Sequence, residues 1–325
     1  MHVMITGAAG MVGRKLAQRL GDDGTLSGRP IERMTLVDVV EPTPPSGFAG
    51  AVACEVADLS KAGVADDLAG RRPDVIFHLA AIVSGEAEAD FEKGYRINLD
   101  GGRALFEAIR LAGDDYCPRF VFASSIAVFG APFPAKIDDE FFLTPQTSYG
   151  TQKAICELLL ADYSRRGFLD GIGIRLPTIC VRPGKPNKAA SGFFSGILRE
   201  PLNGEKAILP VSQDVRHWFA SPRAAVNFLV HAAEIDTAVL GARRSLSMPG
   251  LSATVGEEIE ALRRFAGQSA VDLISHEPDE TITRIVAGWP CDFDTKRAEE
   301  LGFKAEKSFD EILAVYSEDE GPARS

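Results

Sequence analysis

Cysteines are few in this sequence, and none of them forms a paired motif. The 325 residues contain five cysteines, widely spaced and without a Cys-x-x-Cys pair. A disulfide framework or a structural zinc site needs cysteines in matched sets, so this pattern indicates reduced thiols. We therefore predict no metal site and a cytoplasmic location.

Long hydrophobic runs and an excess of positive charge are also missing. No apolar run approaches the roughly 18 residues that a membrane-spanning helix needs, so we predict no membrane span. The net charge of −11 argues against nucleic acid or an anionic membrane as the main partner. A small anionic ligand is compatible with it, because a few clustered basic residues set a local field of their own. With 45% hydrophobic residues, the chain is able to bury a large core.

The first half of the chain alternates short apolar runs with amphipathic stretches. Such alternation is typical of a parallel sheet covered by helices on both faces. Strands are predicted at His2–Thr6, Met34–Asp38, Ala51–Glu55, Val75–Leu79, Phe120–Ala123 and Gly173–Leu176, and helices at Met11–Leu20, Lys61–Ala69, Phe91–Leu111 and Ser148–Arg165. This order predicts an α/β fold with a Rossmann-type doubly wound parallel sheet.

The pattern becomes irregular after about Pro177. Proline and glycine break the basic loop Arg182–Lys188, and shorter helical segments follow it. These segments are predicted at Gly192–Arg199, Ala224–Ala233, Val255–Ala266 and Ser308–Tyr316. We predict a Rossmann domain at 1–177 and a smaller α/β region at 178–325 that mainly binds substrate, with some segments returning to the large sheet.

A glycine-rich turn, Thr6–Gly13, joins the first predicted strand to the first predicted helix. Its Gly-x-x-Gly-x-x-Gly pattern lets the backbone approach a pyrophosphate, and the helix N-terminus offers N–H groups and positive potential. Asp38 ends the second strand, where a carboxylate accepts the ribose hydroxyls of NAD and repels the extra phosphate of NADP. We predict NAD as the cofactor, with NADP as the alternative. The predicted contacts here are Gly7, Gly10, Met11, Val12, Gly13 and Asp38.

Two more segments follow predicted strands at the same edge of the sheet. Asp58 after the third strand would place a carboxylate against the adenine amino group. The small residues after His78 would let the cofactor pass close to the backbone, and His78 itself fits a flanking role better than a catalytic one. These segments add Asp58, Leu59, Leu79, Ala80 and Ala81 to the predicted cofactor contacts.

The candidate catalytic residues are Ser125, Tyr149 and Lys153. Four residues apart on a predicted helix, Tyr149 and Lys153 leave the same face. An ammonium beside a phenol favours the phenolate, so Lys153 is expected to lower the pKa of Tyr149 and make it a general base. Ser125 ends the fifth strand, where its hydroxyl would hold a reacting oxygen. Each feature alone has an ordinary explanation, since Tyr-x-x-x-Lys occurs on solvated helices and serines cap loops.

Taken together, these residues resemble the extended short-chain dehydrogenase/reductases, the NAD-dependent epimerase/dehydratase group. The resemblance covers nearly the whole chain and implies that Ser125, rather than Ser124, acts with Tyr149 and Lys153. It implies that Tyr149 and Lys153 also contact the cofactor, together with Asn98 and Pro177. It further implies a homodimer that pairs the helices at Phe91–Leu111 and Ser148–Arg165.

Three later segments, Arg175–Asn187, Gly192–Asn203 and Asp214–Asn227, are similar to the D-erythronate dehydrogenase subfamily. That resemblance implies NAD-dependent oxidation of the C2 hydroxyl of a four-carbon sugar acid, with Tyr149 as general base. The alternatives are a nucleotide-sugar epimerase or dehydratase, a uronate dehydrogenase, and a non-catalytic NAD-sensing protein. A carboxylate substrate calls for arginine, which binds it bidentately. The candidate substrate contacts are Ser84, Ser125, Tyr149, Arg182, Asn187, Arg216 and His217, with Lys185 and Lys188 as further loop charges.

Overall fold

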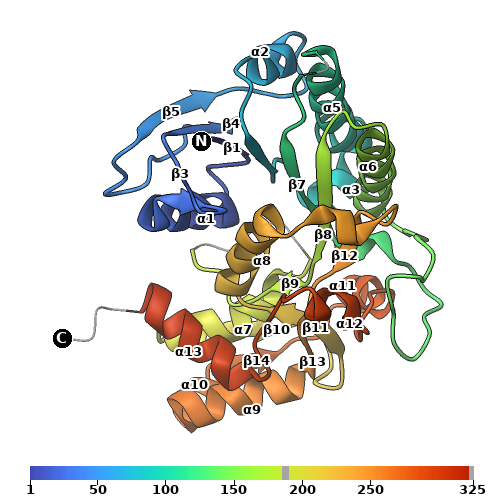
Figure 1. The fold of residues 1–325 in the computed structure, drawn as a ribbon. Helices are drawn as coiled ribbons and strands as arrows, with labels where there is room; N and C mark the ends of the chain where they lie inside the picture. The colour runs from blue at the N-terminus through green and yellow to red at the C-terminus, as the bar shows by residue number, and fades with distance from the viewer. Residues whose placement is uncertain (114, 185–189, 322–325) are drawn as a thin grey trace.

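The computed structural model describes residues 1–113, 115–184 and 190–321. A large sheet with helices on both faces forms one region, and a smaller region lies against the carboxyl edge of that sheet (Figure 1). Among the described residues, no helix combines the length and apolar character that crossing a membrane requires.

The large sheet has seven strands, and every pairing in it is parallel. Its order is β12 (Ser245–Ser247), β8 (Asp170–Leu176), β7 (Arg119–Ser125), β6 (Val75–His78), β1 (His2–Thr6), β4 (Arg33–Asp38) and β5 (Ala51–Val56). The chain leaves β1 toward β4 on one side and later returns to β6 on the other. This reversal opens a crevice at the carboxyl ends of β1 and β6, where ligands of such sheets bind.

Helices cover the sheet because successive strand residues point to opposite faces. On one face, Val3 and Ile5 pack with α1 (Met11–Asp23) and α8 (Pro222–Glu234). On the other, Met4 and Phe120 pack with α2 (Val64–Gly70), α5 (Gly101–Leu111) and α6 (Ser148–Arg165). Between β6 and α5 the chain forms α3 (Ser84–Ala89), α4 (Phe91–Gly94) and the π-helical turn η1 (Tyr95–Asp100). The predicted helix Phe91–Leu111 is therefore three successive helical segments, the middle one wider than an α-helix.

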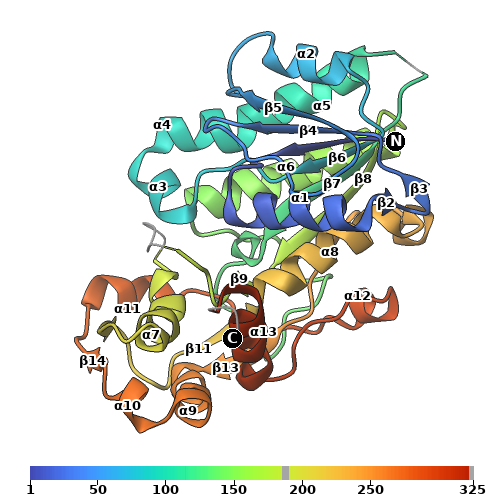
Figure 2. The same cartoon turned by 90° about the vertical axis from the view of Figure 1, so that its left-hand side faces the viewer.

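The smaller region lies below the large sheet in Figure 2. It has a core of its own, built around Phe194, Phe219 and Leu262. A three-stranded sheet, β13 (Leu251–Thr254), β11 (Arg216–Ala220) and β9 (Thr178–Ile179), stands next to the pair β10 (Ala207–Leu209) and β14 (Ile274–His276). Its helices are α7 (Gly192–Leu202), α9 (Val255–Ala266), α10 (Gln268–Val271), α11 (Glu280–Ala287) and α13 (Phe309–Glu320), whereas α12 (Lys296–Glu300) packs at β12 of the large sheet. Short elements elsewhere are β2 (Thr25–Leu26), β3 (Arg29–Pro30), η2 (Ile126–Val128) and η3 (Thr237–Leu240).

Candidate active site

A cavity of about 520 Å³ lies where the carboxyl edge of the large sheet meets the smaller region. It runs from the glycine-rich turn past the ends of β6, β7 and β8 to α7 and β11 of the smaller region. Many of the residues predicted from the sequence line it: Gly7, Gly10, Met11, Val12, Gly13, Leu79, Ser84, Ser125, Tyr149, Pro177, Arg182 and His217.

The glycine-rich turn is packed so closely that side chains would not fit. Gly7 has a φ of 75°, and a Cβ there would lie 2.7 Å from the backbone nitrogen of Ala80. A Cβ on Gly13 would overlap the carbonyl oxygen of Gly7. No side chain caps the start of α1 at Gly10, so the first N–H groups of the helix are left for a ligand. This bare cradle at a helix N-terminus fits the pyrophosphate of a dinucleotide.

Asp38 is fixed beside this turn. Its Oδ2 accepts a hydrogen bond from the backbone nitrogen of Ala9 at 2.9 Å, and its Oδ1 accepts one from that of Val39 at 2.7 Å. Asp58, at the end of β5, accepts hydrogen bonds from Ser60 instead. Burial raises the pKa of Asp58, but the bonds from Ser60 and the charge of Arg96 outweigh it and hold that pKa below its usual value.

Four other predicted cofactor contacts lie just outside the cavity wall. Ala80 packs against Gly7, Ala81 is exposed at the sheet edge, and Leu59 is part of the core under α2. Asn98, in the π-helical turn, binds the backbone of Ile82 through both polar atoms and donates to Gln152 Oε1 at 2.8 Å. Asn98 therefore ties the loop after β6 to α6.

Tyr149 lies beside Ser125 because the N-terminus of α6 packs closely against the segment that follows β7. Thr147 caps the helix by accepting a hydrogen bond from the Gly150 nitrogen at 3.1 Å. A Cβ on Gly150 would overlap the carbonyl oxygen of Ala127, two residues beyond Ser125. The close approach that glycine permits brings the first turn of α6 to the serine.

The first turns of α6 carry Tyr149, which is half-buried, and Lys153, which is buried. Lys153 Nζ donates to the carbonyl oxygen of Ala123 at 2.8 Å and lies 5.7 Å from the centre of the Tyr149 ring. Burial raises the pKa of Tyr149, while the Ser125 hydroxyl and the Arg182 charge act against it. The Lys153 ammonium is bound to the end of β7, and its expected effect on the pKa of Tyr149 stays a prediction. Burial lowers the pKa of Lys153 itself to about 8.

His78 is a structural residue, as expected. It is buried, and its Nδ1 hydrogen-bonds the Thr6 hydroxyl at 2.7 Å. Burial, with a smaller contribution from the charge of Lys153, lowers the pKa of His78 to about 3, so the ring is neutral.

Arg182 brings a positive charge to the wall opposite the glycine turn. Its Nε donates to the carbonyl oxygen of Ile179 and its Nη2 to the Ser191 hydroxyl, each at 2.9 Å. Burial lowers the pKa of Arg182, but the side chain remains a cation because the ordinary pKa of an arginine is far above neutral pH. Arg199 lines the same wall and donates to the Arg182 carbonyl oxygen at 2.8 Å.

His217 supplies a neutral polar surface beside Arg182. Its ring stacks on Phe194, and its Nε2 hydrogen-bonds the Thr178 hydroxyl at 2.6 Å. Burial and then the charge of Arg182 lower the pKa of His217 to about 3. Its Nδ1 is buried and makes no hydrogen bond of full geometry among the described residues, while the nearby Pro290 backbone acts on the pKa of the ring in the raising direction.

One predicted substrate contact, Arg216, is not brought to this cavity. Arg216 points to the other face of β11 from His217, donates to the Ser252 carbonyl oxygen and lies 3.5 Å from Glu257. Its side chain is 43% exposed, and it lines a separate hollow, so it is not part of the site. Asn187, with Lys185 and Lys188, lies outside the described residues.

Sequence reasoning missed several residues that line the cavity: Gln146, Thr178, Ser191, Ser195, Arg199 and Trp289. The serines and Arg199 belong to the segment of α7, which was predicted as a helix without a role. The tryptophan between Gly288 and Pro290 is the one sequence signal that could have pointed to this part of the wall.

Comparison with known proteins gives a consistent family and two kinds of reaction. The NAD dependent epimerase/dehydratase family model matches residues 3–237. D-erythronate dehydrogenase of Cupriavidus necator is 49% identical and covers 100% of both chains. D-erythronate dehydrogenase of Haemophilus influenzae is 43% identical over 98% of this chain and 99% of its own. The crystal structure of the nucleoside-diphosphate-sugar epimerase from Agrobacterium tumefaciens is 68% identical over 98% of this chain and 94% of its own, with a TM-score of 0.96.

Proposed function

The chain belongs to the NAD-dependent epimerase/dehydratase family, the extended short-chain dehydrogenase/reductases, and on that premise we propose that it oxidises D-erythronate at C2 to the 2-oxo acid. The observation that carries the proposal is the buried guanidinium of Arg182 in the cavity of Tyr149 and Ser125. A guanidinium there suits the carboxylate of a small acid whose C2 hydroxyl faces the tyrosine. The two D-erythronate dehydrogenases support the same substrate.

NAD is the proposed cofactor, held by the glycine-rich turn and by Asp38. A carboxylate at the end of β4 favours the two free ribose hydroxyls of NAD over the phosphate of NADP. When bound, the cofactor supplies the hydride acceptor for the oxidation.

The residues of the chain position the hydroxyl and take its proton. Ser125 would donate or accept a hydrogen bond at the reacting oxygen, and Arg182 would hold the carboxylate. Tyr149 would then accept the hydroxyl proton as general base. Because burial disfavours the phenolate, the fraction of competent Tyr149 increases with pH, and we expect the rate of oxidation to rise on the alkaline side. Lys153, one helical turn from Tyr149, ties α6 to β7 through its hydrogen bond to the Ala123 carbonyl oxygen.

A nucleoside-diphosphate-sugar epimerase is the second candidate, because of the 68% identical epimerase structure. Such an enzyme has to hold a nucleoside diphosphate as well as NAD. The wall facing the glycine turn, with Arg182, Arg199, His217 and Trp289, belongs to a cavity of about 520 Å³ that also has to admit the nicotinamide end of the cofactor. This enclosure supports a small acid.

The two functions separate in one assay. Purified protein with NAD and D-erythronate should produce NADH, and Tyr149→Phe should abolish the production while still binding NAD. Galacturonate and glucuronate, used in the same assay, test the uronate dehydrogenase alternative. Interconversion of UDP-sugars without net NADH, by protein that copurifies with tightly bound NAD, would identify an epimerase. NAD binding without turnover of any of these compounds would leave only a sensing role.

We further propose that the protein is a homodimer in the cytoplasm. The outer sides of α4 and α6, which contact one another, expose Phe91 by 60% and Leu158 by 65%. Large apolar side chains exposed on neighbouring helices favour a protein contact. All five cysteines are free, which supports a reducing compartment.

A further inference from the structure

Two segments from opposite halves of the chain join over the cavity. The first, 130–147, precedes α6, and the second, 288–294, follows α11. Ile137 donates its N–H to the carbonyl oxygen of Asp292 at 3.1 Å and accepts from the nitrogen of Asp294 at 2.8 Å. Ile137 and Phe293 are buried together in a small core with Phe129. The two segments therefore form one cover, which we define as residues 130–147 and 288–294.

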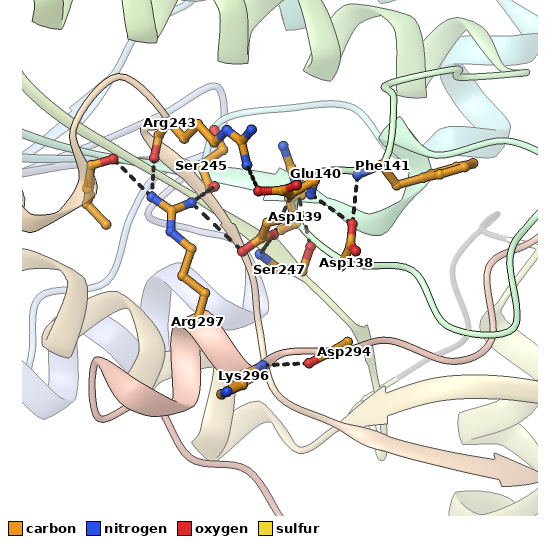
Figure 3. Close-up of polar contacts among 12 residues, drawn as sticks. Asp138, Asp139, Glu140, Phe141, Arg243, Ser245, Ser247, Asp294, Lys296 and Arg297 are labelled. Atoms are coloured by element: carbon orange, nitrogen blue, oxygen red, sulfur yellow. Dashed lines mark hydrogen bonds and ion pairs between the residues drawn. The ribbon is translucent and has the colours of Figure 1, made fainter.

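A buried carboxylate anchors this cover to the large sheet. Asp139 Oδ1 accepts hydrogen bonds from the Ser247 nitrogen at 2.8 Å and from Arg175 Nη1 at 3.2 Å. Figure 3 shows Asp139 between the edge strand at Ser247 and the guanidinium of Arg297, which lies 3.9 Å from Oδ2. Arg175 in turn binds Glu157 of α6. Breaking a buried network of this kind is expensive, so the cover is held in place.

The cover contributes two side chains to the cavity lining, the half-buried Trp289 and the more exposed Gln146, whose Nε2 donates to the carbonyl oxygen of Ala131 at 2.6 Å. Gln146 comes from the first segment and Trp289 from the second, and both line the same space as Tyr149 and Arg182. The segments meet at this point, since a Cβ on Gly288 would lie 3.8 Å from Gln146 Oε1. The Trp289 ring is 5.2 Å from that of His217, which places it beside the polar wall.

We propose that Trp289 and Gln146 determine the length of the substrate, so that the site takes four-carbon aldonates and rejects longer ones. The inference rests on the proposed function, because the carboxylate has to sit at Arg182 and the C2 hydroxyl at Tyr149. Because Gln146 and Trp289 line the same cavity as these two groups, a longer acid would have to fit against a cover that is tied to the rest of the molecule. A side chain that fills such a space discriminates by shape.

D-ribonate and D-allonate test this directly, because they lengthen D-erythronate by one and two carbons with the same hydroxyl stereochemistry. In the wild type we expect kcat/KM to fall at each step. Trp289→Ala should raise the ratio of kcat/KM for D-allonate to kcat/KM for D-erythronate by about tenfold. Gln146→Ala should act in the same direction. Phe142→Ala is the matched control, an aromatic residue of the same cover that is 78% exposed and lines no part of the cavity.

The outcomes separate cleanly. The inference is supported if Trp289→Ala raises the ratio of kcat/KM for D-allonate to that for D-erythronate at least threefold and leaves the dissociation constant for NAD unchanged. A smaller change, or an equal loss for both acids, overturns it. If Trp289→Ala does not fold, Gln146→Ala decides by the same threshold. A wild type that oxidises none of the three acids contradicts the proposed function instead, whereas an active wild type with an unmoved ratio contradicts the length limit alone.

Discussion

Arg182 and Arg216 were equal candidates in the sequence, and the structure separates them into one inside and one outside the cavity. Replacing Arg182 with methionine keeps an unbranched stem like that of arginine and removes the guanidinium with its charge. A substrate carboxylate would then be buried without a partner. Truncating one member of a buried charge pair costs roughly 2–5 kcal/mol. At about 1.4 kcal/mol for each factor of ten, we expect kcat/KM for D-erythronate to fall roughly 30- to 4,000-fold.

Steady-state kinetics on both arginine variants make the comparison. Arg182→Lys keeps a charge without the planar fork and should lose activity to an intermediate degree. Arg216→Met should remain within twofold of the wild type, because Arg216 is 43% exposed and lines a different hollow. Thermal unfolding and NAD titration show whether Arg182→Met still folds and binds cofactor. The reasoning is refuted if Arg182→Met, folded and able to bind NAD, loses less than fivefold, or if Arg216→Met loses as much.

Three further predictions concern the cofactor turn, the buried lysine and the dimer. Gly13→Ala would overlap the Gly7 carbonyl oxygen; we expect a loss of about 1–3 kcal/mol in stability and at least tenfold weaker NAD binding, measured by unfolding and titration. The fall in the pKa of Lys153 from 10.5 to about 8 on folding corresponds to about 3 kcal/mol, because the buried ammonium is disfavoured. The folded protein binds fewer protons than the unfolded chain between these two values, so wild-type stability relative to Lys153→Met should rise from pH 8 to about 10.5; a flat difference in urea unfolding would refute this. Leu158→Glu should yield a monomer of unchanged stability in size-exclusion chromatography with light scattering, because that side chain is 65% exposed; an unchanged elution would contradict the dimer.

The family and the doubly wound fold were predictable because they depend on local patterns. The Thr6–Gly13 turn and the apolar strands carry their own signals, and both predictions are confirmed. The outcome for Arg216 depended on a strand, Arg216–Ala220, that the sequence analysis did not predict. Once that strand is known, alternation of side chains puts His217 and Arg216 on opposite faces.

Other features could not be predicted because they depend on tertiary packing. Whether Lys153 turns toward Tyr149 or toward Ala123 depends on how α6 packs against β7, which no local pattern encodes. The pairing of Ile137 with Phe293 joins residues more than 150 positions apart. The cover over the cavity depends on this pairing. Residues 288–290 also reach the cavity only through tertiary packing, so their place in its wall was not predictable from the sequence.

The most direct test of the proposed reaction follows the hydrogen at C2. D-erythronate deuterated at C2 is incubated with the protein and NAD, and the NADH formed is examined by mass spectrometry. The account predicts NADH that carries the deuterium, formed together with the 2-oxo acid, and none with Tyr149→Phe. Unlabelled NADH would mean that another carbon is oxidised, and an absence of NADH alongside UDP-sugar interconversion would contradict the dehydrogenase altogether.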